Sequence, residues 1–436
     1  YTDWDYIMVN HFDDYADTVT STDSASFIDS AIAQSSTGRI FLVADAQPAE
    51  CGYLQCKTGT GYTEINGKKH LLLTNGNHGD KLSTFGYYVG DYEGDFAPVF
   101  TRADSKVTEY SVDREFRLYK NGEALYTEQK GSEGVKVQQN IFYSAAELRC
   151  YKTTYLWLRY SDDNGKTWSS PTILSEQVKN EKESFLGVGP GRGVVINHNG
   201  KERILFCVYD NNGLFKDPIF ENASAIYTDD NGATWHRSNK IKIKAGLKKT
   251  SEAQLVKIDS GDYKALRMYA RNLSNYIAYA DSTDGGETWT DFRADKALEG
   301  TKNCMVSLID TTRKLNGKQM LLCSAGGNLK ARADGVLRAG VVENNGEVNW
   351  ISKYHLTQGF YGYSCLTELN DGNFAVFYED EAAHLKYTVF SVADDGTINE
   401  INGDNLDFKP DLSAKAKRST SFKRFTAKIK FALGLM

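Results

Sequence analysis

An eight-residue phrase occurs three times in this chain, and it constrains the fold more than any other feature. It reads SDDNGKTW at 161–168, TDDNGATW at 228–235 and STDGGETW at 282–289, so the copies start 67 and then 54 residues apart. Asp followed by Asn-Gly or Gly-Gly predicts a tight turn, because Gly tolerates positive φ and Asp bonds its own backbone. The closing Trp gives each turn an apolar anchor where the next strand begins. We therefore assign the repeats to architecture and look for the chemistry elsewhere.

Strand-like text surrounds every copy and predicts an all-β fold. TTYLWLRY, ASAIYT and SNYIAYAD precede the three copies, and ENNGEVNW at 343–350 resembles a worn fourth copy. The composition of 26 Tyr and 21 Phe with only 6 Pro favours strands, since aromatic side chains fit a half-buried pleated surface. Repeated hairpins with about four strands per unit and no helical periodicity are typical of stacked small sheets. A β-propeller, which arranges such sheets around a channel, is the expected architecture.

Two segments interrupt the rhythm of the repeats. Residues 95–140 are highly charged and predict a small inserted β subdomain within a larger domain that covers 1–408. Residues 409–436 form a basic tail with eight Lys/Arg and one Asp. This tail is interpreted either as a solvated appendage or as a membrane-surface segment, with Phe, Ile and Leu between the Lys residues. The net charge of −6 and the absence of a basic face in the body argue against a nucleic-acid partner.

The order of several core segments resembles that of a known family. SFLGVGPGRGVV (184–195), KTSEAQLVKIDSGDYKALRMYAR (249–271), SAGGNLKARADG (324–335) and GFYGYSCLTEL (359–369) resemble the large bacterial exo-sialidases of glycoside hydrolase family 33, in the sialidase (neuraminidase) superfamily. The resemblance implies a six-bladed propeller and hydrolysis of terminal sialic acids from glycoproteins or glycolipids. It also implies an extracellular location and chemistry without a metal or organic cofactor.

The resemblance also implies a set of site residues. Tyr363 in YGYSCL matches the nucleophile, and Glu252 in KKTSEAQLV matches the carboxylate that activates it. Arg271 and Arg332 match two arginines that bind the substrate carboxylate, with Arg267 as the competitor of Arg271.

The general acid/base is matched near the start of the sequence. Asp3 in YTDWDYIM occupies this position, and Asp5 is the nearby alternative.

These residue types suit the substrate. A sialoside carries a carboxylate on its anomeric carbon, which repels an anionic nucleophile at close range. A neutral phenol avoids that repulsion but needs a base, because free Tyr has a pKa near ~10. The planar fork of Arg fits the carboxylate better than the point charge of Lys. Sialidases with a Tyr nucleophile are a recognised exception to the two-carboxylate rule of glycosidases.

The sequence departs from the family pattern at its start. The family's first carboxylate-binding arginine lies in an Arg-Ile-Pro motif, which is absent here, and Arg39 in TGRIFLVAD resembles a later strand. We therefore expect an incomplete first blade, from a truncated sequence or, alternatively, a degenerate paralogue.

The sequence leaves two other functions open, as well as the role of one loop residue. The alternatives to hydrolysis are an intramolecular trans-sialidase and a sialic-acid-binding propeller without turnover. Arg192 in GPGRG is either a substrate-facing loop residue or part of a structural turn.

Overall fold

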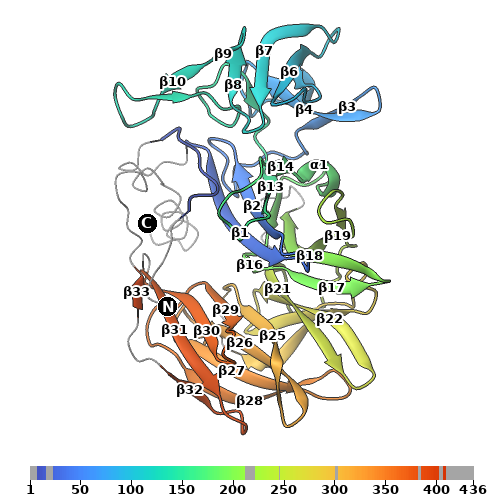
Figure 1. The fold of residues 1–436 in the computed structure, drawn as a ribbon, viewed down its shortest axis with the longest axis vertical. Helices are drawn as coiled ribbons and strands as arrows, with labels where there is room; N and C mark the ends of the chain where they lie inside the picture. The colour runs from blue at the N-terminus through green and yellow to red at the C-terminus, as the bar shows by residue number, and fades with distance from the viewer. Residues whose placement is uncertain are drawn as a thin grey trace.

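A computed structural model describes residues 7–15, 23–211, 221–244, 246–299, 303–381, 384–401 and 406–408. Five sheets lie around a ring, and a separate β domain extends from one side of it (Figure 1). The all-β expectation is confirmed, since the helical elements in this part of the chain are the one-turn α1 (Ser175–Val178) and η1 (Leu82–Thr84). No helix among the described residues has the length and apolar character needed to cross a membrane.

Each blade is a sheet of four or five strands that are mostly consecutive in the chain. Blade A contains β1 (Ser26–Gln34), β2 (Ile40–Gln47), β13 (Tyr155–Ser161), β14 (Thr172–Ile173) and the short β16 (Gly191–Arg192). Blade B contains β15 (Phe185–Val188), β17 (Val194–His198), β18 (Lys201–Asn211), β19 (Glu221–Thr228) and β20 (His236–Arg237). Blade C contains β21 (Thr250–Ser260), β22 (Tyr263–Asn272), β23 (Tyr276–Ser282) and β24 (Arg293–Glu299).

The last two blades complete the described part of the ring. Blade D contains β25 (Ser307–Leu315), β26 (Lys318–Gly326), β27 (Gly335–Val342) and β28 (Val348–His355). Blade E contains β29 (Ser364–Glu368), β30 (Phe374–Glu381), β31 (His384–Val392), β32 (Ile398–Glu400) and β33 (Leu406–Phe408).

The expectation of six blades is wrong for the described residues, which form five. A sixth sheet would need strands ahead of β1, but residues 7–15 and 23–25 form none beyond an isolated bridge between Tyr15 and Lys130. This stretch instead packs on blade A and the inserted domain. The ring of Phe12 stacks on Phe27 at 4.5 Å and on Phe142 at 5.3 Å. Burial of Phe12 in the core shared by blade A and the inserted domain is favourable, so residues 7–15 pack there and do not form a strand of a sixth blade.

The inserted domain lies between two neighbouring strands of blade A, since β2 and β13 pair directly. The segment 95–140, where a small β subdomain was expected, belongs to a larger sheet that begins at Tyr62 and ends at Cys150. That sheet contains β3 (Tyr62–Ile65), β4 (Lys68–Thr74), β5 (Tyr87–Val89), β6 (Phe96–Thr101), β7 (Val107–Asp113), β8 (Leu118–Lys120), β9 (Glu123–Ala124) and β12 (Arg149–Cys150). A two-stranded ribbon of β10 (Tyr126–Glu128) and β11 (Lys136–Gln138) accompanies it.

The three repeats are turns, as their sequence predicts, and they join β13 to β14, β19 to β20 and β23 to β24. In the first copy, Asp163 Oδ1 accepts from the Thr167 backbone N–H at 2.8 Å, and its Oδ2 accepts from the Thr167 hydroxyl at 2.6 Å. Trp168 Nε1 donates to the Gly165 carbonyl at 3.0 Å. The second and third copies repeat these bonds.

The turns also hold neighbouring blades together, which the sequence pattern does not reveal. Trp235 of blade B is 3% exposed, and its ring packs edge-on against Phe41 of blade A at 6.4 Å. A Cβ at Gly286 in the third repeat would come within 2.5 Å of Leu205 in blade B, so glycine permits that close approach.

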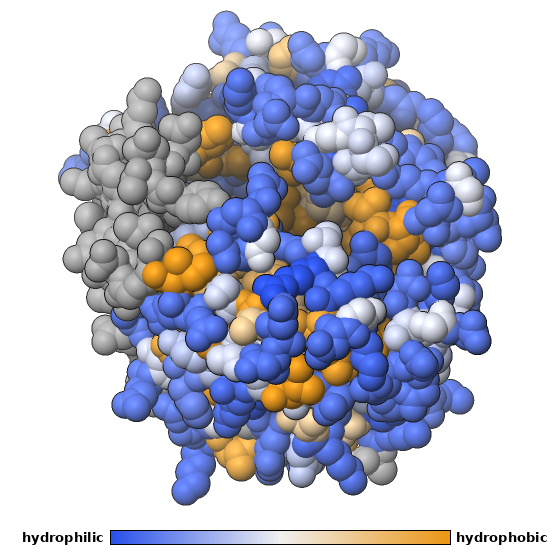
Figure 2. Space-filling model, turned by 60° about the horizontal axis from the view of Figure 1, so that its bottom comes forward, coloured by the Kyte–Doolittle hydropathy of each residue, from blue (hydrophilic) through white to orange (hydrophobic). Residues whose placement is uncertain are grey.

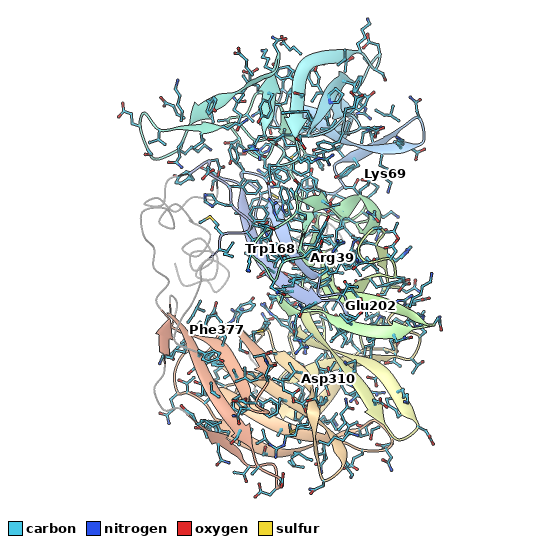
Figure 3. All side chains as sticks on the ribbon, in the orientation of Figure 1. Arg39, Lys69, Trp168, Glu202, Asp310 and Phe377 are labelled. Atoms are coloured by element: carbon cyan, nitrogen blue, oxygen red, sulfur yellow. The ribbon has the colours of Figure 1, made fainter. Side chains whose placement is uncertain are left out.

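Polar contacts add to this packing between blades, and their carboxylates lie along the ring in Figure 3. Glu202 of blade B accepts from the Ser36 backbone in blade A at 2.8 Å, and Asp310 of blade D accepts from the Lys257 backbone in blade C at 3.2 Å. Lys69 in β4 donates to the Glu176 carbonyl in α1 at 2.7 Å and ties the inserted domain to the ring (Figure 3). The face that the lower blades present is mostly hydrophilic, with apolar patches around a recess (Figure 2).

Candidate active site

A phenol and a carboxylate from different blades meet in a short hydrogen bond. Tyr363 precedes β29 of blade E, and its hydroxyl donates to Glu252 Oε1 at 2.5 Å. Glu252 lies near the start of β21 in blade C, where the pairing with β22 shifts register between Thr250 and Ala253. Such a bulge re-aims side chains at the end of a strand. Glu252 is only 4% exposed, so its carboxylate interacts with neighbouring side chains rather than with solvent.

Two arginines flank the pair. Arg271, near the end of β22, donates through Nη1 to Glu252 Oε2 at 2.7 Å and lies 3.4 Å from the Tyr363 hydroxyl. Arg332 lies in the loop between β26 and β27 of blade D, with its guanidinium carbon 5.6 Å from the centroid of the Tyr363 ring. The structure therefore brings together four of the residues that the sequence selects: Glu252, Arg271, Arg332 and Tyr363.

One residue contacts both arginines. The Asn303 side-chain oxygen accepts from Arg271 Nε at 3.0 Å, and its backbone carbonyl accepts from Arg332 Nη2 at 3.3 Å. Within the described part of the chain, Arg271 Nη2 makes no hydrogen bond, so this group is available to a ligand. Two guanidinium groups held in this way can bind a carboxylate.

Arg267 has a different role. Its guanidinium makes a bidentate pair with Asp281, at 2.6 and 2.9 Å, and both side chains are almost fully buried within blade C. The structure thus places Arg271, rather than its competitor, beside Glu252.

The electrostatics favour different protonation states for Glu252 and Tyr363. Burial, then the charge of Glu252, raise the pKa of Tyr363 well above its usual value, although Arg271 and Arg332 oppose this rise. Burial alone would raise the pKa of Glu252, but the charge of Arg271 and the hydrogen bond from Tyr363 outweigh it and lower that pKa. The resting site therefore holds a neutral phenol against an ionised carboxylate. This is the arrangement of a nucleophile with its base.

The sequence did not point to Glu379 on β30, whose side chain and backbone both bond the backbone of Tyr363. The Glu379 Oε2 accepts from the Tyr363 N–H at 3.1 Å, and the Glu379 N–H donates to the Tyr363 carbonyl at 3.0 Å. A Cβ at Gly362 would overlap the Glu379 carboxylate, so a larger residue there would displace that side chain from the Tyr363 N–H. In the sequence, FAVFYED has only the pattern of a strand, and no local signal distinguishes this Glu.

Asp29 was also missed. It lies at a β-bulge in β1 with a φ of 52°, and its charge contributes to the raised pKa of Tyr363. Positive φ at a residue other than Gly is uncommon and marks a special backbone position. The charge of Asp29 in blade A therefore acts on Tyr363 in blade E.

Not every residue selected from the sequence can be placed in this cluster. Asp3 and Asp5 fall outside the described residues, as does the tail 409–436. Arg192 belongs to β16 and pairs through its backbone with Ile32 of β1, and its charge acts on Cys365 of β29 in blade E, so its role stays a prediction. Arg39 pairs with Asp162 of the first repeat at 2.7 Å and stacks over the Tyr160 ring of blade A (Figure 3).

Comparisons with known proteins identify the family of this chain. A family model described as a BNR repeat-like domain matches residues 136–376. The chain is 32% identical over 382 residues to the anhydrosialidase of Macrobdella decora, covering 82% of this chain and 47% of that protein. It is 28% identical over 376 residues to sialidase B of Streptococcus pneumoniae, covering 82% of this chain and 50% of that protein.

Solved structures show the same likeness. The leech intramolecular trans-sialidase has a TM-score of 0.75 at 30% identity, over 88% of this chain and 60% of that one. The intramolecular trans-sialidase of Ruminococcus gnavus has a TM-score of 0.73 at 30% identity, over 92% and 85%. The chain belongs to the sialidase superfamily. It spans about half the length of the curated relatives it matches.

Proposed function

We propose that this protein is an exo-α-sialidase that removes terminal sialic acids from glycoproteins or glycolipids outside cells, with retention of configuration. The observation that carries the proposal is the 2.5 Å bond between Tyr363 and Glu252 beside Arg271. The low pKa of this carboxylate and the neutral phenol suit the attack on an anionic sugar. The names of the relatives support the same substrate class.

In the proposed reaction, Arg271 and Arg332 bind the sugar carboxylate. As Tyr363 Oη attacks the anomeric carbon, its proton passes to Glu252, and the bond to the leaving oxygen breaks. Asp3, assigned by the family resemblance alone, protonates that oxygen. Water then attacks the sialyl–tyrosine adduct with Asp3 as base, and the proton on Glu252 returns to the phenolate. Two inversions at one carbon give net retention.

A second outcome for the same adduct is intramolecular transfer, in which a hydroxyl of the bound sugar replaces water. The relatives favour this candidate specifically, since two structures at 30% identity are named intramolecular trans-sialidases and one is complexed with 2,7-anhydro-Neu5Ac. Both outcomes use the same tyrosine and the same base.

The test is cleavage of a sialoside with a fluorescent leaving group, followed by mass spectrometry of the released sugar. Hydrolysis gives a free sialic acid, whereas internal transfer gives a product lighter by one water. Tyr363→Phe should remove most turnover while leaving sialoside binding in place. If the wild-type protein binds sialosides but releases no leaving group, it is a binding propeller and the proposal fails. Turnover that Tyr363→Phe leaves unchanged would remove the tyrosine from the mechanism.

A further inference from the structure

The inserted domain contains a cavity of about 390 Å³, far along the chain from the catalytic residues. It lies between the hairpin of β3 and β4 and the strands β5 and β6, in the upper domain of Figure 1. Cavities of this size are in the range of small-molecule sites, which are usually apolar with a few polar groups. This cavity is more polar than that, since charged and polar side chains such as Lys68, Asp91 and Glu93 line it beside the rings of Tyr88 and Phe100.

Aromatic rings form one wall. Tyr88 and Phe100 are stacked, with ring centroids 5.4 Å apart and planes 17° from parallel, and His70 lies against Tyr88 at 5.0 Å. Tyr88 is buried beneath, whereas Phe100 is half-buried and lines the cavity. A Cβ at Gly90 would come within 2.5 Å of Phe100 Cε2, so glycine leaves the space that the ring occupies. The face of an aromatic ring carries a partial negative charge and attracts C–H groups.

Hydrogen-bonding groups surround the ring. His70 Nδ1 donates to the Val89 carbonyl at 2.9 Å, which fixes the tautomer and leaves Nε2 as an acceptor. Lys68 pairs with Asp91 at 2.6 Å, and both side chains are exposed. The Glu93 side chain has no hydrogen bond or ion pair with any described residue. Two carboxylates against one ammonium leave this rim with a net negative charge.

We propose that this cavity is a binding site for a neutral pyranose, with the apolar face of the sugar on Phe100. The sugar hydroxyls would donate to His70 Nε2 and to the carboxylates of Asp91 and Glu93. The charge of the rim excludes an anionic sugar, in contrast to the catalytic cluster with its two arginines. The site therefore differs from the catalytic site in both location and ligand charge.

The experiment measures binding of three methyl glycosides to the full chain by saturation-transfer NMR: β-galactoside, β-glucoside and β-glucuronide. The last two differ only in one carboxylate, and none is a sialoside, so the result does not depend on turnover. Phe100→Leu removes the aromatic face but keeps apolar volume, and His70→Gln removes the imidazole. Phe96→Leu, on the same strand β6 with its ring against Tyr119 outside the cavity, is the matched control.

We expect saturable, millimolar binding of at least one neutral glycoside and weaker binding of the glucuronide. Phe100→Leu should weaken the neutral ligand about tenfold, and Phe96→Leu should leave it unchanged. Circular dichroism of each variant distinguishes loss of the site from loss of the fold, and His70→Gln provides the second test if Phe100→Leu unfolds the domain. The proposal is overturned by no saturable binding up to about 20 mM, by equal binding of the glucuronide, or by binding that survives both substitutions.

Discussion

Replacing Glu252 with Gln isolates the charge on which the proposed chemistry depends. Gln keeps the size of the side chain and can still accept from Tyr363, but it cannot take the phenolic proton. Blade C offers a matched control in Asp281→Asn, because Asp281 is also a buried carboxylate paired with an arginine, Arg267, and belongs to no part of the tyrosine cluster. Comparison of the two variants separates catalysis from stability.

The contacts set the expected magnitudes. Glu252→Gln removes the negative charge from the acceptor of two hydrogen bonds, from Tyr363 and from Arg271, at a cost of roughly 1 kcal/mol each. Asp281→Asn leaves Arg267, which is 2% exposed, without its counter-charge, and breaking such a buried pair costs about 3–5 kcal/mol. A lost general base lowers the rate by about 10² to 10⁴. Asp281→Asn should therefore be the less stable variant and Glu252→Gln the less active one.

The assay combines urea denaturation with kcat for a fluorescent sialoside, normalised to the folded fraction. We expect kcat to fall at least about a hundredfold in Glu252→Gln and less than about threefold in Asp281→Asn. The reasoning is refuted if both variants lose activity in proportion to their stability, because the carboxylate at 252 would then have only a structural role.

Three further outcomes follow from the structure. Arg332→Lys keeps the charge but loses the planar fork, and kcat/KM in steady-state kinetics should fall about ten- to a hundredfold; an unchanged value would remove Arg332 from the carboxylate site. Trp235→Ala should cost about 3–5 kcal/mol in urea denaturation because Trp235 packs between blades, whereas the half-buried Trp168 should cost less; equal losses would contradict the docking role. Burial raises the pKa of Glu379. The folded protein therefore resists ionisation of this group more than the unfolded chain does, and the carboxylate destabilises the fold as pH rises from the usual carboxylate range through the raised pKa. Glu379→Gln should accordingly stabilise the protein at pH 8 but not at about pH 4. Thermal melts at the two pH values check this, and a gain confined to acid would reverse the sign.

Local spacing explains what the sequence predicted well. The repeats are turns whose hydrogen bonds connect residues two to four positions apart, such as Asp163 and Thr167. Each eight-residue repeat therefore contains all the residues that form its turn. The packing of Trp235 on Phe41 connects blades and depends on the ring, so no local pattern reports it.

The candidate site shows where sequence reasoning stopped. Tyr363 and Glu252 are 111 residues apart, and they were selected by resemblance to a family rather than by spacing. Glu379 and Asn303 were missed because they act through backbone groups or by bridging two arginines, and neither leaves a residue-type signature. The six-blade expectation came from the family resemblance, and it failed for the described residues because the stretch around Phe12 packs on a shared core instead of pairing into a sheet.

The tyrosine cluster takes one or more side chains from each of three consecutive blades: Glu252 and Arg271 from blade C, Arg332 from blade D and Tyr363 from blade E. Each sheet can form its own ladder before its neighbours dock, but the phenol meets its base only after all three are in register. During refolding, the enzymatic rate should consequently recover later than the β-sheet signal. The recovery of turnover would then report the docking of blades C, D and E.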